Sequence, residues 1–202
     1  MSGTGYPRPI EDLIDILSTL PSVGKRSAER MALAMLKWQP EKLAVFGALA
    51  AALPEKITPC PECGNFAENG NKCAICVSPR RDRSLVCVVE DSTQIRSVES
   101  SSLFNGVYHV LGGKLAPLSG TGIDDLNIDS LLQRIKIEGV KELILALSPD
   151  VEGQATAVYI ANLVQDRSII VTRLAQGLPA GSDLTYVDSA TIGIALSGRT
   201  AL

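Results

Sequence analysis

The N-terminal part of the chain has hydrophobic positions spaced as on amphipathic helices. One set follows the i, i+3, i+4, i+7 pattern and predicts a helix that Pro21 ends: Ile10, Leu13, Ile14, Leu17 and Leu20. A short turn, 21–24, leads into a second helix predicted over 26–37, and a third is predicted over 41–53, ending at Pro54. The pattern therefore indicates a small helical domain at this end of the chain.

The pattern changes twice further on. Residues 57–83 are rich in Cys, Gly, Asn and Pro and show no helical period. Short apolar runs then alternate with stretches of helical spacing near 93–102, 127–138 and 153–165; the runs are Leu85–Val89, Val107–Leu111, Leu143–Leu147 and Ile169–Thr172. This alternation predicts a largely parallel sheet covered on both faces. We expect a mobile loop at 112–122 and a short strand followed by a helix over 184–198.

Composition narrows the class of protein. Of 202 residues, 46% are hydrophobic, which is enough for a sizeable core in one or two domains. No apolar run approaches the roughly 20 residues of a membrane span, and the first residues lack a signal peptide pattern, so we expect a cytoplasmic protein with reduced thiols. The single histidine argues against a Ser-His-Asp triad and a His-ligated metal.

Charge is unevenly distributed. The net charge of −3 combines −2 over residues 1–20, +4 over residues 21–83 and −5 over residues 84–202. This asymmetry indicates two modules with different partners, although uneven solvated surfaces would give the same numbers.

Four cysteines carry the strongest chemical signal: Cys60, Cys63, Cys73 and Cys76. Each C-x2-C pair places two sulfur atoms around one point, and two such pairs complete a tetrahedron for Zn²⁺. Four protein ligands leave no open position, so we expect one structural zinc per chain, with a redox pair or an iron–sulfur cluster as the alternatives. Cys87 lies inside an apolar run and is interpreted as a buried hydrophobic residue.

The turn before the second helix is basic. Lys25, Arg26 and Arg30 stand at or near a helix N-terminus, where free backbone N–H groups favour an anion. Arg26 and Arg30 are four residues apart and share a helix face. This is how a helix-hairpin-helix holds a DNA phosphate without reading sequence, and an ordinary helical hairpin with a basic end is the alternative.

Three acids follow apolar runs: Glu90 after one, and Asp150 and Glu152 after another. At the carboxyl ends of parallel strands they would share one edge and could hold Mg²⁺. The alternative is solvated loop acids, with Glu152 helping to cap a helix from Gly153. His109, inside an apolar run, is interpreted as a hydrogen-bonded structural residue.

A basic helical hairpin, a four-cysteine module and an acid-tipped α/β domain, in this order, resemble the RecR family of bacterial recombination mediators. The resemblance runs from about Leu20 to Arg199, and its most specific motifs are YHVLGGKLAPL and VTRLAQGLPAGSDL. LPSVGKRSAERMA, CPECGNF and ILALSPDVEGQATAVYI also match.

The resemblance implies a Toprim domain and an adaptor that forms ring-like tetramers, partly by exchanging N-terminal helical segments. With RecO, and possibly RecF, it would help load RecA onto single-stranded DNA coated by single-strand-binding protein. Single- and double-stranded DNA would be bound without sequence preference through Arg26 and Arg30, with Lys25 beside them. Glu90, Asp150 and Glu152 would meet RecO, with weak Mg²⁺ binding as a by-product.

The sequence departs from the family pattern in four places. Ser22 stands where the family usually has Gly, Gln154 where it has Glu, and Asp150 where it more often has Thr. The C-terminal segment Leu-Thr-Tyr-Val-Asp-Ser, 184–189, lacks two acids of the Walker-B-like pattern and keeps only Asp188.

We therefore expect a helix-hairpin-helix domain over 1–54, a zinc finger over 55–80, a Toprim domain over 81–173 and a C-terminal segment over 174–202. Two other functions stay open. One is a Mg²⁺-dependent Toprim nuclease or primase that uses Glu90 as general acid/base and Asp150 and Glu152 as ligands. The other is a zinc-dependent DNA-binding regulator.

Overall fold

The computed structural model describes residues 5–165 and 168–199, which form two compact units that meet in the chain between Lys56 and Ile57. Each unit has its own hydrophobic core. None of the helices among the described residues has the length and apolar character needed to cross a bilayer.

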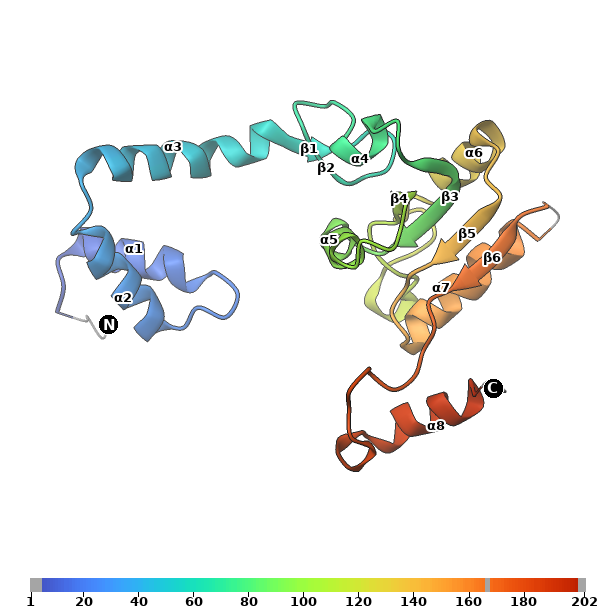
Figure 1. Ribbon diagram of the computed structural model, residues 1–202. Coiled ribbons are helices and arrows are strands. Elements are labelled where there is room, and N and C mark those ends of the chain that lie inside the picture. The colour runs from blue at the N-terminus through green and yellow to red at the C-terminus, as the bar shows by residue number, and fades with distance from the viewer. Residues whose placement is uncertain (1–4, 166–167, 200–202) are drawn as a thin grey trace. The chain divides into compact units, whose positions relative to one another are not determined.

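The N-terminal unit contains α1 (Arg8–Ser18), α2 (Lys25–Met35) and α3 (Pro40–Lys56) (Figure 1). Ile14 of α1 packs on Ala28 and Ala32 of α2, whose small side chains let the two helices approach closely. The three helices confirm the periodicity prediction. The third continues past Pro54 to Lys56, because a proline in the last turn affects few backbone hydrogen bonds.

Helix α3 has no buried residue. Its exposed apolar side chains, Val45, Phe46, Leu49 and Leu53, follow the spacing of one helix face. We call these four residues the α3 stripe. These side chains form an apolar face that the described residues leave exposed.

The second unit begins with the antiparallel pair β1 (Ile57–Pro59) and β2 (Phe66–Glu68), followed by the one-turn helix α4 (Ala74–Val77). Its main sheet contains β3 (Asp82–Val89), β4 (Gly106–Val110), β5 (Glu142–Leu145) and β6 (Ile170–Arg173), all parallel, in the order β4-β3-β5-β6. The connecting helices are α5 (Ser92–Ser100), α6 (Ile128–Glu138) and α7 (Val151–Leu163).

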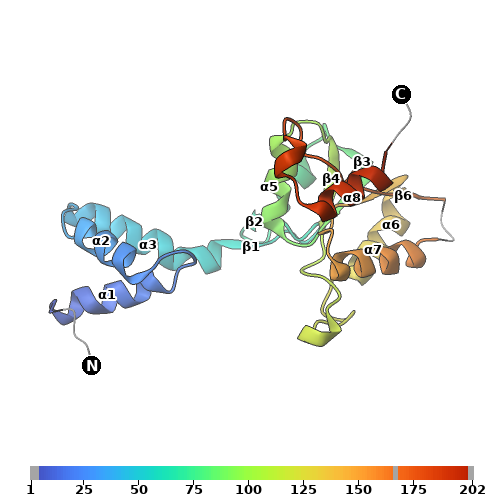
Figure 2. The ribbon, with the colours of Figure 1, turned by 90° about the horizontal axis from the view of Figure 1, so that it is seen from below.

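Both faces of this sheet are covered, as predicted. Val86 and Val88 of β3 lie in a core with residues of α6 and α7, while Cys87 and Val89 lie in a second core with Ile95 of α5. The alternation follows from the two-residue period of a strand. The loop between β4 and α6 carries a short 3-10 helix, Pro117–Ser119, and extends from the body of this unit (Figure 2).

The C-terminal segment corrects one prediction. The short strand expected near Leu184 is a 3-10 helix, Leu184–Tyr186, followed by α8 (Ser189–Ser197). The physical reason is local capping: Asp183 accepts a hydrogen bond from the Thr185 N–H, and Asp188 accepts one from the Thr191 N–H. Such aspartates favour turns and helix starts over strands.

Candidate functional site

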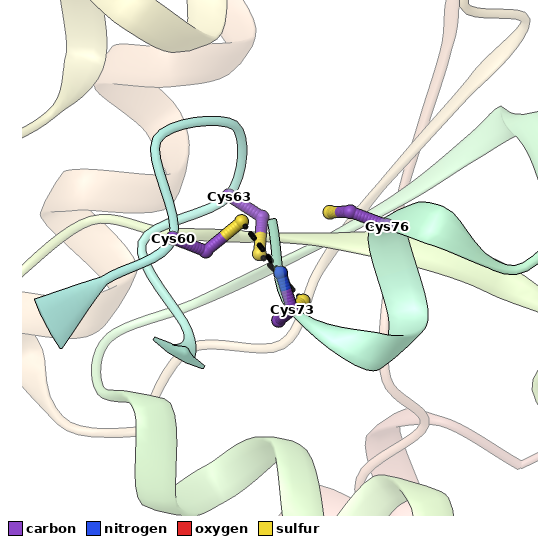
Figure 3. Close-up of side chains that lie close together, drawn as sticks. All are labelled: Cys60, Cys63, Cys73 and Cys76. Carbon is purple, nitrogen blue, oxygen red and sulfur yellow. Dashed lines mark hydrogen bonds between the residues drawn. The ribbon is translucent and has the colours of Figure 1, made fainter. Parts of the chain in front are cut away.

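The four cysteines come together at one point (Figure 3). Their sulfur atoms all lie within 4.8 Å of one another, and all four residues are buried. Cys60 and Cys63 lie on the turn between β1 and β2. Cys73 directly precedes α4, and Cys76 lies within that helix. The Cys63 and Cys73 sulfurs are 3.6 Å apart, close to the roughly 3.8 Å between ligands of a tetrahedral ion with bonds of about 2.3 Å. We call this cluster the cysteine knuckle.

The backbone of the knuckle suits thiolates. The N–H of Cys73 donates to the Cys60 sulfur at 3.3 Å, and the N–H of Asn65 donates to the Cys63 sulfur at 3.5 Å. Gly64 has φ +77°, and a Cβ there would lie 3.0 Å from the Cβ of Val110, so the turn requires glycine.

The thiols need a cation to ionise together. Burial would raise the pKa of Cys60, but backbone hydrogen bonds, led by that from Cys73, lower it to about 7. The pKa of Cys73 is raised, chiefly by burial, and that of Cys76 is raised by its hydrogen bond with Cys63 and by burial. Charges on neighbouring sulfurs add to both increases. A divalent ion removes this repulsion, so the donor set fits a metal closed to substrate.

The knuckle is fixed to the main sheet. The Val110 N–H of β4 donates to the Cys63 carbonyl at 2.8 Å, and the Ser92 hydroxyl donates to the Gly64 carbonyl at 3.1 Å. Ile75 of α4 packs against the core on the α5 face. The knuckle and the sheet therefore share one packed structure.

Glu62, between two of the cysteines, is the centre of an ion-pair cluster. Its carboxylate binds Lys72 at 2.6 Å, Arg83, and Arg134 at 3.5 Å. Glu138 of α6 pairs with both arginines, at 2.7 and 3.0 Å. Burial would raise the pKa of Glu62, but hydrogen bonds from Lys72 and Arg83 lower it to about 2. We call these five residues the Glu62 cluster. The sequence patterns did not predict it, and the only indication in the sequence is that Glu62 lies between Cys60 and Cys63.

The basic turn lies at the start of α2. Lys25, Arg26 and Arg30 are exposed, and none of them has an ion pair within the described part of the chain. Gly24 precedes the helix, no side chain caps it, and its first turn contains no acid. Ser22 has φ +64°, the left-handed region in which the family's usual Gly costs nothing.

The three acids at the strand ends are held internally. Glu90 accepts from the N–H and the hydroxyl of Ser148, at 2.5 and 3.0 Å. Asp150 accepts from the Gly153 N–H at 2.8 Å and so is the cap of α7, which corrects the expectation that Glu152 caps a helix from Gly153.

Lys114, from the loop after β4, joins two of these acids. Its ammonium lies 2.5 Å from an Asp150 oxygen and 3.5 Å from a Glu152 oxygen. The pKa of Lys114 is raised, first by the hydrogen bond to Asp150 and also by the charges of Glu90 and Glu152. A single lysine in a glycine-rich loop gave no sequence signal for this contact.

The interpretations of Cys87 and His109 are confirmed. Cys87 is 2% exposed, and burial raises the pKa of its thiol to about 12. His109 is 2% exposed, and its Nε2 lies 2.8 Å from the Asn127 carbonyl.

The fold and the sites define a class of multidomain protein that joins a helix-hairpin-helix to a cysteine knuckle and a Toprim domain. Family models agree: residues 10–55 match the RecR helix-hairpin-helix, residues 84–175 the Toprim domain and residues 177–200 the RecR C-terminal region.

Curated relatives cover nearly the whole chain. The recombination protein RecR of Acidothermus cellulolyticus is 47% identical over 98% of each chain. That of Rubrobacter xylanophilus is 45% identical over 98% of each chain. That of Staphylococcus saprophyticus is 44% identical over 98% of this chain and 99% of its own. The chain belongs to the RecR family of recombination proteins, which places it in recombination.

Proposed function

We propose that this protein is a cytoplasmic, non-enzymatic recombination mediator that binds DNA through the basic turn. With RecO, and in some settings RecF, it helps load RecA onto single-stranded DNA coated by single-strand-binding protein. The observation that carries the proposal is the exposed set Lys25, Arg26 and Arg30, which has no ion pair among residues 5–165 and 168–199 and lies beside the uncapped start of α2.

The basic turn has the properties of a phosphate contact. Its cations need not break an ion pair within the described residues before they bind, and the uncapped N–H groups of α2 add a partial positive charge. Phosphate contacts position a protein on single- or double-stranded DNA and do not read bases. We therefore expect binding of both kinds of DNA with little sequence preference.

The test is DNA binding as a function of salt. Arg26→Ala should weaken binding to unrelated single strands equally. The slope of the logarithm of the binding constant against the logarithm of the salt concentration should become less steep by about 1. Lys37→Ala, which removes an exposed charge beyond the other end of α2, is the matched control and should change little. Unchanged affinity in Arg26→Ala, or a strong sequence preference in the wild type, would refute the assignment.

We assign the metal of the cysteine knuckle as zinc, because four sulfur ligands with tetrahedral spacing suit Zn²⁺ and leave no coordination position for substrate. The ion would contribute folding energy to a segment with few apolar residues of its own.

We further propose that the α3 stripe is covered by another copy of this chain in a ring-like tetramer. Val45, Leu49 and Leu53 are each about 60% exposed, which is costly for a surface that stays in water. Several basic turns in one ring would raise the effective concentration at the DNA. Leu49→Glu should lower the mass in solution, while Glu55→Gln, on the same helix, should not; an unchanged mass in Leu49→Glu would refute this interface.

Glu90, Asp150 and Glu152 form the acidic edge of the Toprim domain, and we assign it to contact with a basic surface of RecO. Complementary charge of this kind gives specificity and fast association. The alternative, a Mg²⁺-dependent nuclease or primase, requires carboxylates free for metal, whereas Glu90 and Asp150 use both of their oxygens internally. Cleavage or primer synthesis with Mg²⁺ or Mn²⁺ that disappears in Glu90→Gln would establish the alternative.

A further inference from the structure

Lys114 places a positive charge beside the carboxylates of the acidic edge. Its ammonium contacts Asp150 at 2.5 Å and Glu152 at 3.5 Å, and it feels the charge of Glu90. Its side chain is 22% exposed, against 51% for Asp150 and 44% for Glu152. The Lys114 side chain as a whole is therefore less exposed than the side chains of the two acids that it joins.

The backbone on both sides of Lys114 fixes its position. The N–H of Gly112 donates to the carbonyl of Glu90 at 3.0 Å. The N–H of Leu115 donates to the hydroxyl of Thr156 in α7 at 2.9 Å. Gly112 has φ +87°, a conformation that glycine permits as the chain leaves the sheet. The segment 112–115 thus forms a strap from the end of β3 to the first turns of α7.

Every carboxylate oxygen of Glu90 and Asp150 already accepts a hydrogen bond, and Lys114 of the strap supplies one of them. One oxygen of Asp150 accepts from the Gly153 N–H and the other from Lys114, and both oxygens of Glu90 accept from Ser148. A divalent cation such as Mg²⁺ needs carboxylate oxygens in a regular octahedron together with water or phosphate. A Mg²⁺ ion would therefore have to displace the Lys114 ammonium from Asp150 against the repulsion between the two positive charges.

We propose that Lys114 is a built-in counter-cation that takes the place of a divalent ion at the acidic edge and keeps that ion out. This inference deepens the proposed non-enzymatic function by naming the residue responsible. An ammonium group offsets one of the three negative charges, but it cannot coordinate a phosphate or a water as a metal ion does. Because the strap tethers Lys114 beside the acids, the ammonium competes for them as an intramolecular partner.

The test compares Mn²⁺ binding by the zinc-loaded, full-length wild type and by Lys114→Gln, with free Mn²⁺ followed by electron paramagnetic resonance. Lys141→Gln is the matched control: it removes an exposed lysine next to the start of β5, at the opposite end of the strands. We expect Lys114→Gln to bind one Mn²⁺ per chain at least tenfold more tightly than wild type or Lys141→Gln. Adding Asp150→Asn to Lys114→Gln should remove that gain.

Two results would overturn the proposal. One is a wild type that binds Mn²⁺ as tightly as Lys114→Gln and loses it in Asp150→Asn, because Lys114 would then exclude nothing. The other is a Lys114→Gln protein that gains no site. The proposed function fails separately, if the wild type cleaves or synthesises nucleic acid, whatever the Mn²⁺ affinities.

Discussion

His109 makes the stability of this protein depend on pH in a window that one substitution can isolate. The residue is the only histidine in the chain. Its side chain lies in β4 with 2% exposure, and its buried Nδ1 has no hydrogen-bond partner among the residues that the structure describes. Burial, together with the positive charge of Arg134 and despite the hydrogen bond to Asn127, lowers the pKa of His109 from 6.5 to about 4.

The sign follows from proton binding. The folded state takes up its proton only near pH 4, while the unfolded state does so near pH 6.5, so the unfolded state binds more protons between these values. Above about pH 6.5, protonation of His109 therefore does not change the free energy of unfolding. Below that pH the free energy of unfolding falls, and the whole contribution of His109 is lost below about pH 4. The difference in pKa amounts to about 3 kcal/mol in total, of which about 2 kcal/mol is lost between pH 7 and pH 5.

The perturbation is His109→Gln, whose amide can still donate to the Asn127 carbonyl but does not titrate. Any cost of the new side chain is independent of pH. The change with pH in the stability difference between variant and wild type therefore reports the contribution of His109 protonation alone. Urea unfolding, followed by circular dichroism with zinc present, should show the variant gaining about 2 kcal/mol relative to wild type from pH 7 to pH 5. The histidine ring protons should show no titration by nuclear magnetic resonance above pH 5. A parallel pH dependence of the two proteins, or a histidine that titrates near 6.5, would refute the reasoning.

The remaining predictions concern the metal, the Glu62 cluster and the basic turn. Cys63→Ser should lower the zinc content measured by elemental analysis and the melting temperature, and a variant that melts like wild type would contradict a structural ion. Arg134→Met should destabilise the fold by roughly 2 kcal/mol in urea unfolding, because it removes the charged hydrogen bond to the Tyr108 carbonyl and one cation from each of Glu62 and Glu138; Lys136→Met, exposed on the same helix, should cost little. Ser22→Gly should stabilise the N-terminal unit by about 1 kcal/mol in thermal unfolding by relieving the positive φ, and a loss of stability would show that Ser22 is not strained. Glu152→Lys should abolish RecO association measured by interferometry while DNA binding and zinc content stay unchanged.

Local patterns in the sequence predicted most of the elements and the metal ligands. Helical spacing predicted α1 and α2, apolar runs predicted the four strands of the main sheet, and the two C-x2-C pairs predicted the cluster at Cys60–Cys76. These features depend on neighbours within a few residues, where backbone geometry fixes which side chains share a face or a point. The same locality explains the failure near Leu184, where aspartate caps favour turns over the strand that the apolar spacing indicated.

The tertiary structure alone decided which charges meet. Lys114 lies 36 residues from Asp150 in sequence and Arg134 lies 72 from Glu62, so no local period records either contact. The first arises because β3 pairs with β4 on one side and β5 on the other, which brings their ends together, and the second because the knuckle is hydrogen-bonded to β4. The sequence thus determined the parts and the zinc ligands of this protein. The order of strands in the sheet determined that its acidic edge carries an internal cation, since ion pairs form wherever the packed backbone places opposite charges within a few ångströms.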